Sequence, residues 1–301
     1  VSHKLYEVKE ICDEIAVLRD GELVARKPTA EVTPSGMANL MVGRELSRIF
    51  PPKVKVSETS PVILETEKLT LRKLVKDVSF KLRKGEMLGF AGLGGSGRTD
   101  LAEAIYGVRK TVSGTIRKNG KILNVNSPAE AVAAGIAYLS EDRQGSGVIT
   151  SFSVTSNNTL ISLKNYCSGG FIRKSSEREA AKSYAEKFAL KTPSLDSPLN
   201  FLSGGNQQKV AIAKGLDTKP EVFIFDEPTR GIDIKSRSEV YHFIHGLAAQ
   251  GVACIIISSD LEEIIGLCAR VAVMRGGTIA GFLEDDHVNE KEIMYLAAGV
   301  K

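Results

Sequence analysis

The sequence predicts an α/β fold with a mainly parallel core sheet, an antiparallel β region from about Val62 to Glu86, and a helical arm. Three observations predict this class. An apolar run at Met87–Ala91 leads through a glycine-rich loop into a helix-like segment at Thr99–Tyr106. The apolar runs Val222–Phe225 and Val252–Ile257 have the continuity that is typical of buried parallel strands. We therefore expect these three runs to form the centre of one sheet.

Composition excludes several classes of protein. The chain has 301 residues, a formal net charge of +4 and no run of six or more Lys or Arg residues, so a nucleic-acid partner is not indicated. No stretch approaches the roughly 18 apolar residues that cross a bilayer, and the first residues do not resemble a signal peptide. The four cysteines have no CxxC spacing, which indicates core packing in a reducing cytosol.

The two ends of the chain match each other without gaps when their residue numbers are offset by 256. A long-period match at both ends, over about forty residues, is the signature of tandem domains. We therefore expect residues 1–47 to be the C-terminal tail of a first domain, 48–60 a linker and 61–301 a complete second domain of a longer tandem protein. Cys12 and Cys268 fall at equivalent positions, which predicts a shared core slot. Other matched pairs are Ser2/Ser258, Glu7/Glu263, Ile11/Leu267, Ile15/Val271, Val32/Val288 and Leu40/Leu296.

The loop Gly92–Gly97 has the strand–loop–helix context that a phosphate-binding loop requires. Glycines let backbone N–H groups turn inward, and the helix N-terminus adds partial positive charge. The Thr99 hydroxyl is placed to reach Mg²⁺. Arg98 stands where such loops carry a lysine, and its planar fork does not replace a compact point charge. The residues expected to bind the nucleotide here are Gly92, Gly94, Gly95, Ser96, Gly97, Arg98, Thr99 and Asp100.

Two adjacent carboxylates end the apolar run Val222–Phe225. Asp226 is expected to hold Mg²⁺ through water, and Glu227 to orient or deprotonate an attacking water. The alternative without a function is a surface turn that carries two acidic residues.

A helical subdomain is expected over about residues 145–212. Within it, Ser175–Leu190 has apolar positions at helical spacing behind a capping serine. A second helix opens at Ser203, and its N-terminus is a second place where an anion is stabilised. The candidate nucleotide-binding residues of this segment are Ser203, Gly204, Gly205, Asn206 and Gln207.

The phrases GLGGSGRTDLAEAIYG, GIAYLSEDR, LSGGNQQK and IFDEPTRGID resemble ABC ATPase domains. They are most similar to the second half of the tandem ATP-binding subunits of bacterial ribose-, galactose- and xylose-type importers, over nearly the whole chain. The resemblance implies a P-loop NTPase fold, ATP and Mg²⁺ as cofactors, and ATP hydrolysis coupled to carbohydrate transport, weak in the isolated chain. It also favours catalytic carboxylates over a surface turn, because PTRGID matches the loop that communicates between paired ATPase domains.

The same resemblance implies the partners. Two ATPase halves of one subunit pair head to tail around two nucleotides, so LSGGNQ of this half serves the nucleotide of the other half. The subunit lies peripherally on the cytoplasmic face of the cell membrane, under transmembrane permease subunits. A periplasmic or extracellular sugar-binding protein acts through the permease, and no nucleic acid is implied.

Three positions depart from the pattern that the resemblance implies for a working ATPase. Arg98 replaces a lysine, Glu141 stands where a glutamine contacts Mg²⁺ and the γ-phosphate, and Ser259 replaces a histidine. The repeat shows the last change internally, because the residue that matches Ser259 is His3. The implied catalytic residues are Glu227, Glu141 and Ser259, and the implied metal contacts are Thr99, Asp226 and Glu141. We expect one strong and one degenerate ATP site per tandem pair.

Alternative functions lack features that they require. A soluble tandem ABC protein acting on ribosomes needs a long charged linker between its copies, and the segment Phe50–Ser60 is short. A chromosome-maintenance ATPase needs a long coiled-coil insertion that this sequence does not contain. A non-hydrolysing regulatory nucleotide-binding module stays open as the alternative to an active ATPase.

Overall fold

The structure is a computed structural model that describes residues 5–19, 22–33, 36–37, 40 and 50–300. A six-stranded core sheet has the strand order β14-β13-β5-β12-β11-β8. The five strands from β13 to β8 are parallel, and β14 joins the edge antiparallel to β13. The predicted α/β fold is thus confirmed. The strands are β5 (Met87–Gly92), β8 (Ile136–Leu139), β11 (Val222–Asp226), β12 (Ala253–Ile257), β13 (Arg270–Arg275) and β14 (Thr278–Glu284).

Apolar runs form the central strands because both faces of the core sheet are covered. Along β11, Phe223 and Phe225 pack into one apolar cluster, and Val222 and Ile224 pack into another on the opposite face. All four side chains are completely buried. Alternation between two dry faces leaves no polar position in the strand until Asp226, as expected for a parallel sheet.

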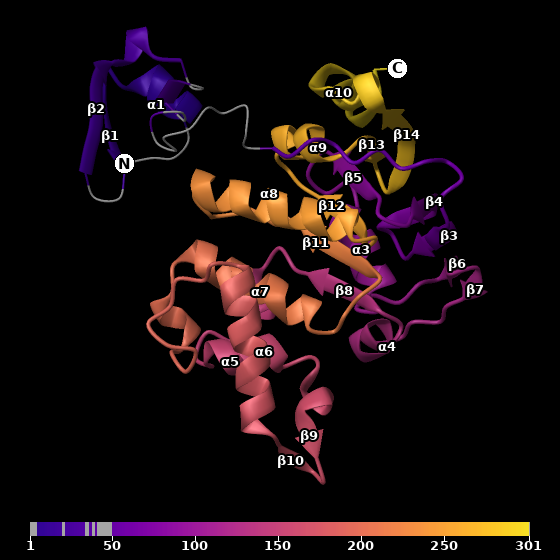
Figure 1. The fold of residues 1–301 in the computed structure, drawn as a ribbon. Coiled ribbons are helices and arrows are strands. Elements are labelled where there is room, and N and C mark those ends of the chain that lie inside the picture. The colour runs from indigo at the N-terminus through magenta and orange to yellow at the C-terminus, as the bar shows by residue number, and fades with distance from the viewer. Residues whose placement is uncertain (1–4, 20–21, 34–35, 38–39, 41–49, 301) are drawn as a thin grey trace.

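A second, antiparallel sheet has the order β4-β3-β6-β7. Its strands β3 (Val62–Leu71) and β4 (Val75–Arg83) lie in the β region that the sequence predicted. The strands β6 (Ser113–Lys118) and β7 (Lys121–Ile122) lie outside that prediction. They join through β3, where Thr66 faces Ile116, and this pairing across a distant segment has no local signal in the sequence. Figure 1 shows this sheet beside the core sheet.

The helical subdomain contains α5 (Val154–Thr159), α6 (Lys174–Lys187) and α7 (Gly204–Leu216). The predicted helix over Ser175–Leu190 is therefore confirmed, with its end three residues earlier. A two-stranded hairpin, β9 (Cys167–Ser168) and β10 (Phe171–Ile172), precedes α6 and projects from the end of the subdomain in Figure 1.

Most of the remaining helices lie around the core sheet (Figure 1). The helix α3 follows β5, and α8 follows β11, so the connections between parallel strands run through helices. None of the helices in the described part of the chain is long and apolar enough to span a membrane. The bounds are α3 (Arg98–Ile105), α4 (Pro128–Ala133), α8 (Ile234–Ala249), α9 (Leu261–Leu267) and α10 (Glu290–Ala298).

The N-terminal segment repeats the elements of the C-terminal end at the offset of 256. The helix α1 (Leu5–Ile11) corresponds to α9, and the hairpin β1 (Glu14–Arg19) and β2 (Glu22–Pro28) to β13 and β14. Even the irregularity in strand register recurs, between Val17 and Leu18 in one hairpin and between Val273 and Met274 in the other.

Burial differs between the two copies of this unit. Ile11 is 79% exposed and Leu18 is 63% exposed, whereas their equivalents Leu267 and Met274 are fully buried. The predicted shared core slot for Cys12 and Cys268 is wrong, because Cys12 is exposed and Cys268 is buried. The difference arises because α9 and β13 contact β5, and no described strand takes the place of β5 beside α1 and β1.

The segment predicted to be a linker packs against α8 and α9 where it is described, from Phe50 onward. The Phe50 ring stacks on Tyr241 of α8, with 4.8 Å between ring centroids and 16° between planes. The Phe50 ring also lies so close to Gly266 of α9 that a Cβ there would meet it at 2.5 Å. Farther along, Lys55 pairs with Asp285 at 2.6 Å. Residues 48 and 49 lie outside the described part.

Candidate nucleotide site

The loop between β5 and α3 forms an open cradle of backbone. Gly92 has a φ of 149°, and a Cβ at this position would lie 2.4 Å from the Met274 carbonyl oxygen. Gly97 has a φ of 97°, and its Cβ would meet the Leu74 carbonyl oxygen at 2.9 Å. At Gly94 and Gly95, by contrast, no atom lies within 4 Å of an added Cβ. The loop is fixed at its two ends and open in its middle, as a phosphate cradle must be.

Two buried oxygen atoms near this loop lack hydrogen-bond partners among the described residues. They are Ser96 Oγ in the loop and Asp226 Oδ1 at the end of β11. Buried polar atoms are normally paired, so these two oxygens can meet a ligand that binds at the loop. A hydroxyl and a carboxylate beside a phosphate cradle are the donor set that suits Mg²⁺·nucleotide. Thr99, another predicted metal contact, also acts on the Asp226 carboxylate through its hydroxyl.

Burial raises the pKa of Asp226 to about 6. The hydroxyls of Thr99 and Tyr138 oppose this rise, and the Tyr138 hydroxyl donates a hydrogen bond of 3.0 Å to Asp226 Oδ2. The charges of Glu141 and Glu227 add to the rise. In the described residues, no set of three or more His, Cys, Asp or Glu side chains is arranged to hold a metal alone.

The Arg98 side chain is tied to the protein at the start of α3. Its Nη1 donates a hydrogen bond of 2.6 Å to the Ser258 carbonyl oxygen, which follows β12. Burial lowers the pKa of Arg98, and the carboxylates of Glu227, Asp226 and Glu141 oppose that change. The guanidinium thus faces three acids while one of its donors is committed to backbone.

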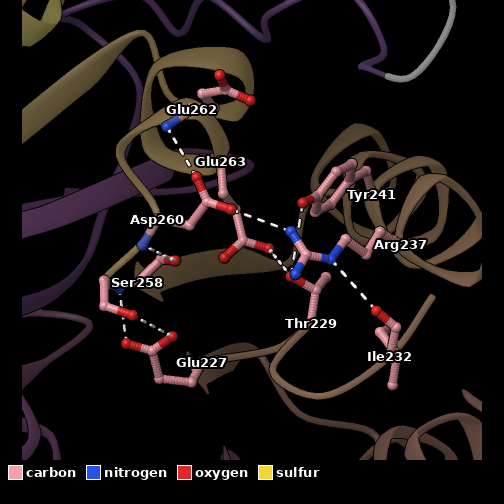
Figure 2. A network of polar contacts seen from close by, with 10 residues as sticks. Glu227, Thr229, Ile232, Arg237, Tyr241, Ser258, Asp260, Glu262 and Glu263 are labelled. Carbon is pink, nitrogen blue, oxygen red and sulfur yellow. Dashed lines mark hydrogen bonds and ion pairs between the residues drawn. The ribbon is translucent and has the colours of Figure 1, made fainter. Parts of the chain in front are cut away.

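Glu227 is held by Ser259, one of the three residues that depart from the family pattern. The Ser259 backbone N–H donates to Glu227 Oε1 at 2.6 Å, and the Ser259 hydroxyl donates to Oε2 at 3.1 Å. Glu227 also has a φ of 50°, in the left-handed region that a non-glycine residue seldom adopts. Figure 2 shows this carboxylate beside the segment that carries Ser258 and Asp260. Both carboxylate oxygens are therefore engaged within the protein.

A polar network behind Glu227 was not found by sequence reasoning (Figure 2). The Thr229 hydroxyl donates to Glu263 Oε1 at 2.9 Å, and it lies 3.5 Å from the Tyr241 hydroxyl. Arg237 Nη1 donates to Asp260 Oδ2 at 3.0 Å. Glu263 is buried, and its burial raises its pKa to about 7. The one available signal was the match of Glu263 with Glu7 in the repeat.

Glu141 lies after β8 and forms an ion pair that spans two loops. Its Oε2 is 3.0 Å from Nη1 of Arg230 in the PTRGID segment. The role of Glu141 as a metal contact stays a prediction, and one of its oxygens is engaged by Arg230. Asp100, another predicted nucleotide-binding residue, pairs with Arg109 at 3.2 Å.

The segment Ser203–Gln207 forms the start of α7 in the helical subdomain. Ser203 is the N-cap, and its Oγ accepts a hydrogen bond of 2.9 Å from the Asn206 side-chain amide. Gln207 is buried and donates to the carbonyls of Leu199 and Leu202, so it shapes the turn before the helix. A Cβ on Gly204 would lie 3.3 Å from a guanidinium nitrogen of Arg143.

Arg143 places positive charge beside this helix start. Its Nε and Nη1 are buried without a hydrogen-bond partner in the described part of the chain, and burial lowers its pKa.

The predicted residues fall into two groups. The phosphate loop, Asp226, Glu227, Glu141 and Ser259 gather at the ends of β5, β8, β11 and β12. The segment Ser203–Gln207 starts α7, next to the 228–231 loop, where Gln208 Nε2 donates to the Pro228 carbonyl at 2.7 Å.

Comparisons with known proteins agree with this geometry. The profile of a family described as ABC transporter matches residues 75–230, just over half of the chain. The ribose import ATP-binding protein RbsA 2 of Rhizobium meliloti (strain 1021) is 44% identical over 301 residues, which are 100% of this chain and 59% of that protein. Ribose import ATP-binding protein RbsA 3 of Rubrobacter xylanophilus is 42% identical, with 100% and 60% covered. The chain therefore spans about three fifths of the length of these relatives.

Solved structures show the same fold. A nucleotide-free ATP-binding cassette from an ABC transporter superposes with a TM-score of 0.65 at 23% sequence identity, covering 79% of this chain and 95% of that one. At this identity the likeness concerns the fold alone. It confirms the predicted fold of a mainly parallel core sheet with an antiparallel β sheet and a helical subdomain.

Proposed function

We propose a function from the premise that this chain belongs to the ABC transporter family. It is the second ATP-binding domain of a tandem subunit that energises sugar import, preceded by the tail of the first domain. One observation carries the proposal: the open phosphate loop lies near two buried oxygens, Ser96 Oγ and Asp226 Oδ1, that have no hydrogen-bond partner within the described part of the chain. The relatives' names, which specify ribose import, support a monosaccharide as the transported substrate.

The tandem organisation is supported by the repeated N-terminal unit. Its elements have the bounds of α9, β13 and β14 at the offset of 256, yet Ile11 and Leu18 are exposed where Leu267 and Met274 are buried. An apolar surface of this kind needs a core sheet to cover it. A first ATPase domain would supply that sheet, and the greater length of the relatives leaves room for one.

The residues of this chain divide the work of nucleotide binding. Backbone N–H groups of Gly92–Gly97 bind phosphate oxygens, and Thr99 and Asp226 hold Mg²⁺. When bound, Mg²⁺ neutralises phosphate charge and thereby favours transfer of the terminal phosphoryl group. Glu227 is the base that orients the attacking water. In this proposal Ser203 and the backbone at the start of α7, with the nearby Arg143, contact the nucleotide of the first domain.

We infer that the site on this phosphate loop is degenerate. Arg98 is tied to the Ser258 carbonyl, both oxygens of Glu227 accept hydrogen bonds from Ser259, and Glu141 is paired with Arg230. Each group that should meet the terminal phosphate or the water is thus engaged within the protein. A non-hydrolysing regulatory module is the second candidate, and the engagement of Glu227 is the observation that favours it.

The proposed partners follow from this function. The first ATPase domain of the same subunit would face the Ser203–Gln207 segment, and transmembrane permease subunits would hold the pair at the cytoplasmic face of the membrane. A periplasmic or extracellular sugar-binding protein would act through the permease.

Calorimetric titration of this chain with Mg·ATP tests the nucleotide site. We expect a dissociation constant in the micromolar range, because the phosphate cradle and Asp226 are intact. Titration with ATP in excess EDTA is the control, and it should show weaker binding because Asp226 and Thr99 then have no ion to hold. Absence of binding, both alone and after addition of the first domain, would contradict the proposed site.

A further inference from the structure

The ion pair between Glu141 and Arg230 involves one of the residues that depart from the family pattern, the carboxylate at position 141. Glu141 follows the edge strand β8, and Arg230 lies 89 positions later in the chain. Their side chains meet at 3.0 Å between Nη1 and Oε2, with 42% of Glu141 and 64% of Arg230 exposed. An exposed pair of this kind contributes little to the stability of the fold. We therefore expect the pair to affect the binding of a charged ligand beside it.

The pair lies within electrostatic reach of the phosphate site. The charge of Glu141 acts on both Arg98 and Asp226, and the charge of Glu227 acts on the same two residues. Three carboxylates therefore surround the one guanidinium of Arg98. A nucleoside triphosphate adds several more negative charges at this place, and like charges at short range oppose binding.

The backbone that carries Arg230 is fixed at two points. The Pro228 carbonyl accepts a hydrogen bond of 2.7 Å from Gln208 of α7, and Thr229 donates to the buried Glu263. Figure 2 shows Thr229 in this network beside Tyr241 and Glu263. The Arg230 backbone N–H also donates to the Glu227 carbonyl at 3.2 Å. Arg230 is thus presented to Glu141 from a hydrogen-bonded loop that also contains Glu227, the proposed base.

We propose that Arg230 is a positioning residue that neutralises Glu141 and so allows this site to accept the phosphates of a nucleoside triphosphate. The inference rests on the proposed function. It also gives a reason for the carboxylate at position 141: the acid is bound to Arg230, and it links the loop after β8 to the loop after β11. In the intact pair, the negative charge of Glu141 and the positive charge of Arg230 cancel.

A double-mutant cycle tests this role through the affinity for Mg·ATP, measured by calorimetry on the whole chain. Arg230→Ala should weaken binding about tenfold, because Glu141 then faces the phosphates without a counterion. Glu141→Gln should tighten binding about threefold, because Arg230 then adds an uncompensated positive charge. The double variant, E141Q/R230A, should return to the wild-type affinity.

Rescue in the double variant separates this role from two others. If Arg230 touches the phosphates itself, or only shapes its loop, the double variant stays as weak as Arg230→Ala, and the inference is wrong. Arg178→Ala is the matched control, since it breaks another exposed pair, with Asp196 at 2.5 Å on the helical subdomain, and should leave affinity unchanged. A wild-type chain without any affinity, both alone and after addition of the first domain, would refute the proposed function. A wild-type chain that binds, with Arg230→Ala equal to it, would refute this inference alone.

Discussion

Replacing Asp226 by asparagine is expected to raise the stability of the chain at pH 8 and to abolish its Mg²⁺-dependent nucleotide binding. Asp226 is completely buried, one of its oxygens lacks a partner among the described residues, and burial raises its pKa to about 6. The ionised carboxylate therefore costs the folded state free energy that an amide would not cost. We expect a gain of about 1–3 kcal/mol, or a few degrees in melting temperature.

The pH dependence of this effect has a definite sign. The folded-state pKa of Asp226 lies above the ordinary value near 3.9, so the folded chain binds the proton more tightly than the unfolded chain. Stability from this group is complete below pH 4 and is lost as the pH rises through about 6. The advantage of Asp226→Asn should therefore grow between about pH 4 and about pH 6, stay constant at higher pH and vanish at low pH. Binding of Mg²⁺ needs the carboxylate, and it should weaken as the pH falls through about 6.

Thermal denaturation and Mg·ATP calorimetry, each measured between pH 5 and pH 8, check this prediction. Asp217→Asn is a matched control, because Asp217 is buried but accepts hydrogen bonds from the hydroxyls of Ser162 and Tyr166. Its replacement should lower stability, since both hydroxyls would lose a charged partner. A loss of stability in Asp226→Asn of the same size would show that Asp226 is a structural residue.

Replacing Arg98, Glu141 and Ser259 together by the residues that the family pattern implies is expected to increase ATP hydrolysis at this site at least tenfold in the complete tandem subunit. The triple variant is R98K/E141Q/S259H. Lysine supplies a compact charge where Arg98 is tied to the Ser258 carbonyl, and glutamine removes a negative charge beside the phosphates. Histidine removes the Ser259 hydroxyl that engages Glu227 Oε2. A tenfold rise corresponds to about 1.4 kcal/mol of barrier, well within what a correctly placed acid–base group supplies.

Steady-state phosphate release measures the gain. The control adds Glu227→Gln to the triple variant, and the added activity should then disappear, because it depends on the base of this site. A triple variant that hydrolyses ATP no faster than wild type would show that these three residues do not limit the site.

The sequence predicted the parts of the fold that local patterns determine. The continuous apolar runs that became β5, β11 and β12 are unambiguous, because a strand buried on both faces has no polar positions. The strand β6 was not predicted, since its pairing with β3 depends on a segment some forty residues away. The burial of Cys268 and exposure of Cys12 could not be predicted from equal positions in a repeat, because burial depends on which strands surround the unit.

The sequence supplied candidate residues for the site but not the contacts between them. Glycine spacing and the paired acids identified the phosphate loop, Asp226 and Glu227, because backbone conformation and metal chemistry restrict those residue types. Contacts such as Arg98 with the Ser258 carbonyl join residues 160 positions apart. The pair of Arg230 with Glu141 and the network around Glu263 likewise form only when distant loops meet at the end of the sheet. No local pattern in the sequence encodes them.

The effect of Glu227→Gln on turnover shows whether the two ATP sites of the tandem subunit are unequal, as proposed. Steady-state ATP hydrolysis should be measured for the complete subunit with and without this one substitution. The turnover of the variant should differ from that of the wild type by no more than about 10%, because the site of this domain contributes little to the total. A halving of turnover would mean two equally active sites, and it would contradict the degenerate site inferred from Arg98, Glu141 and Ser259.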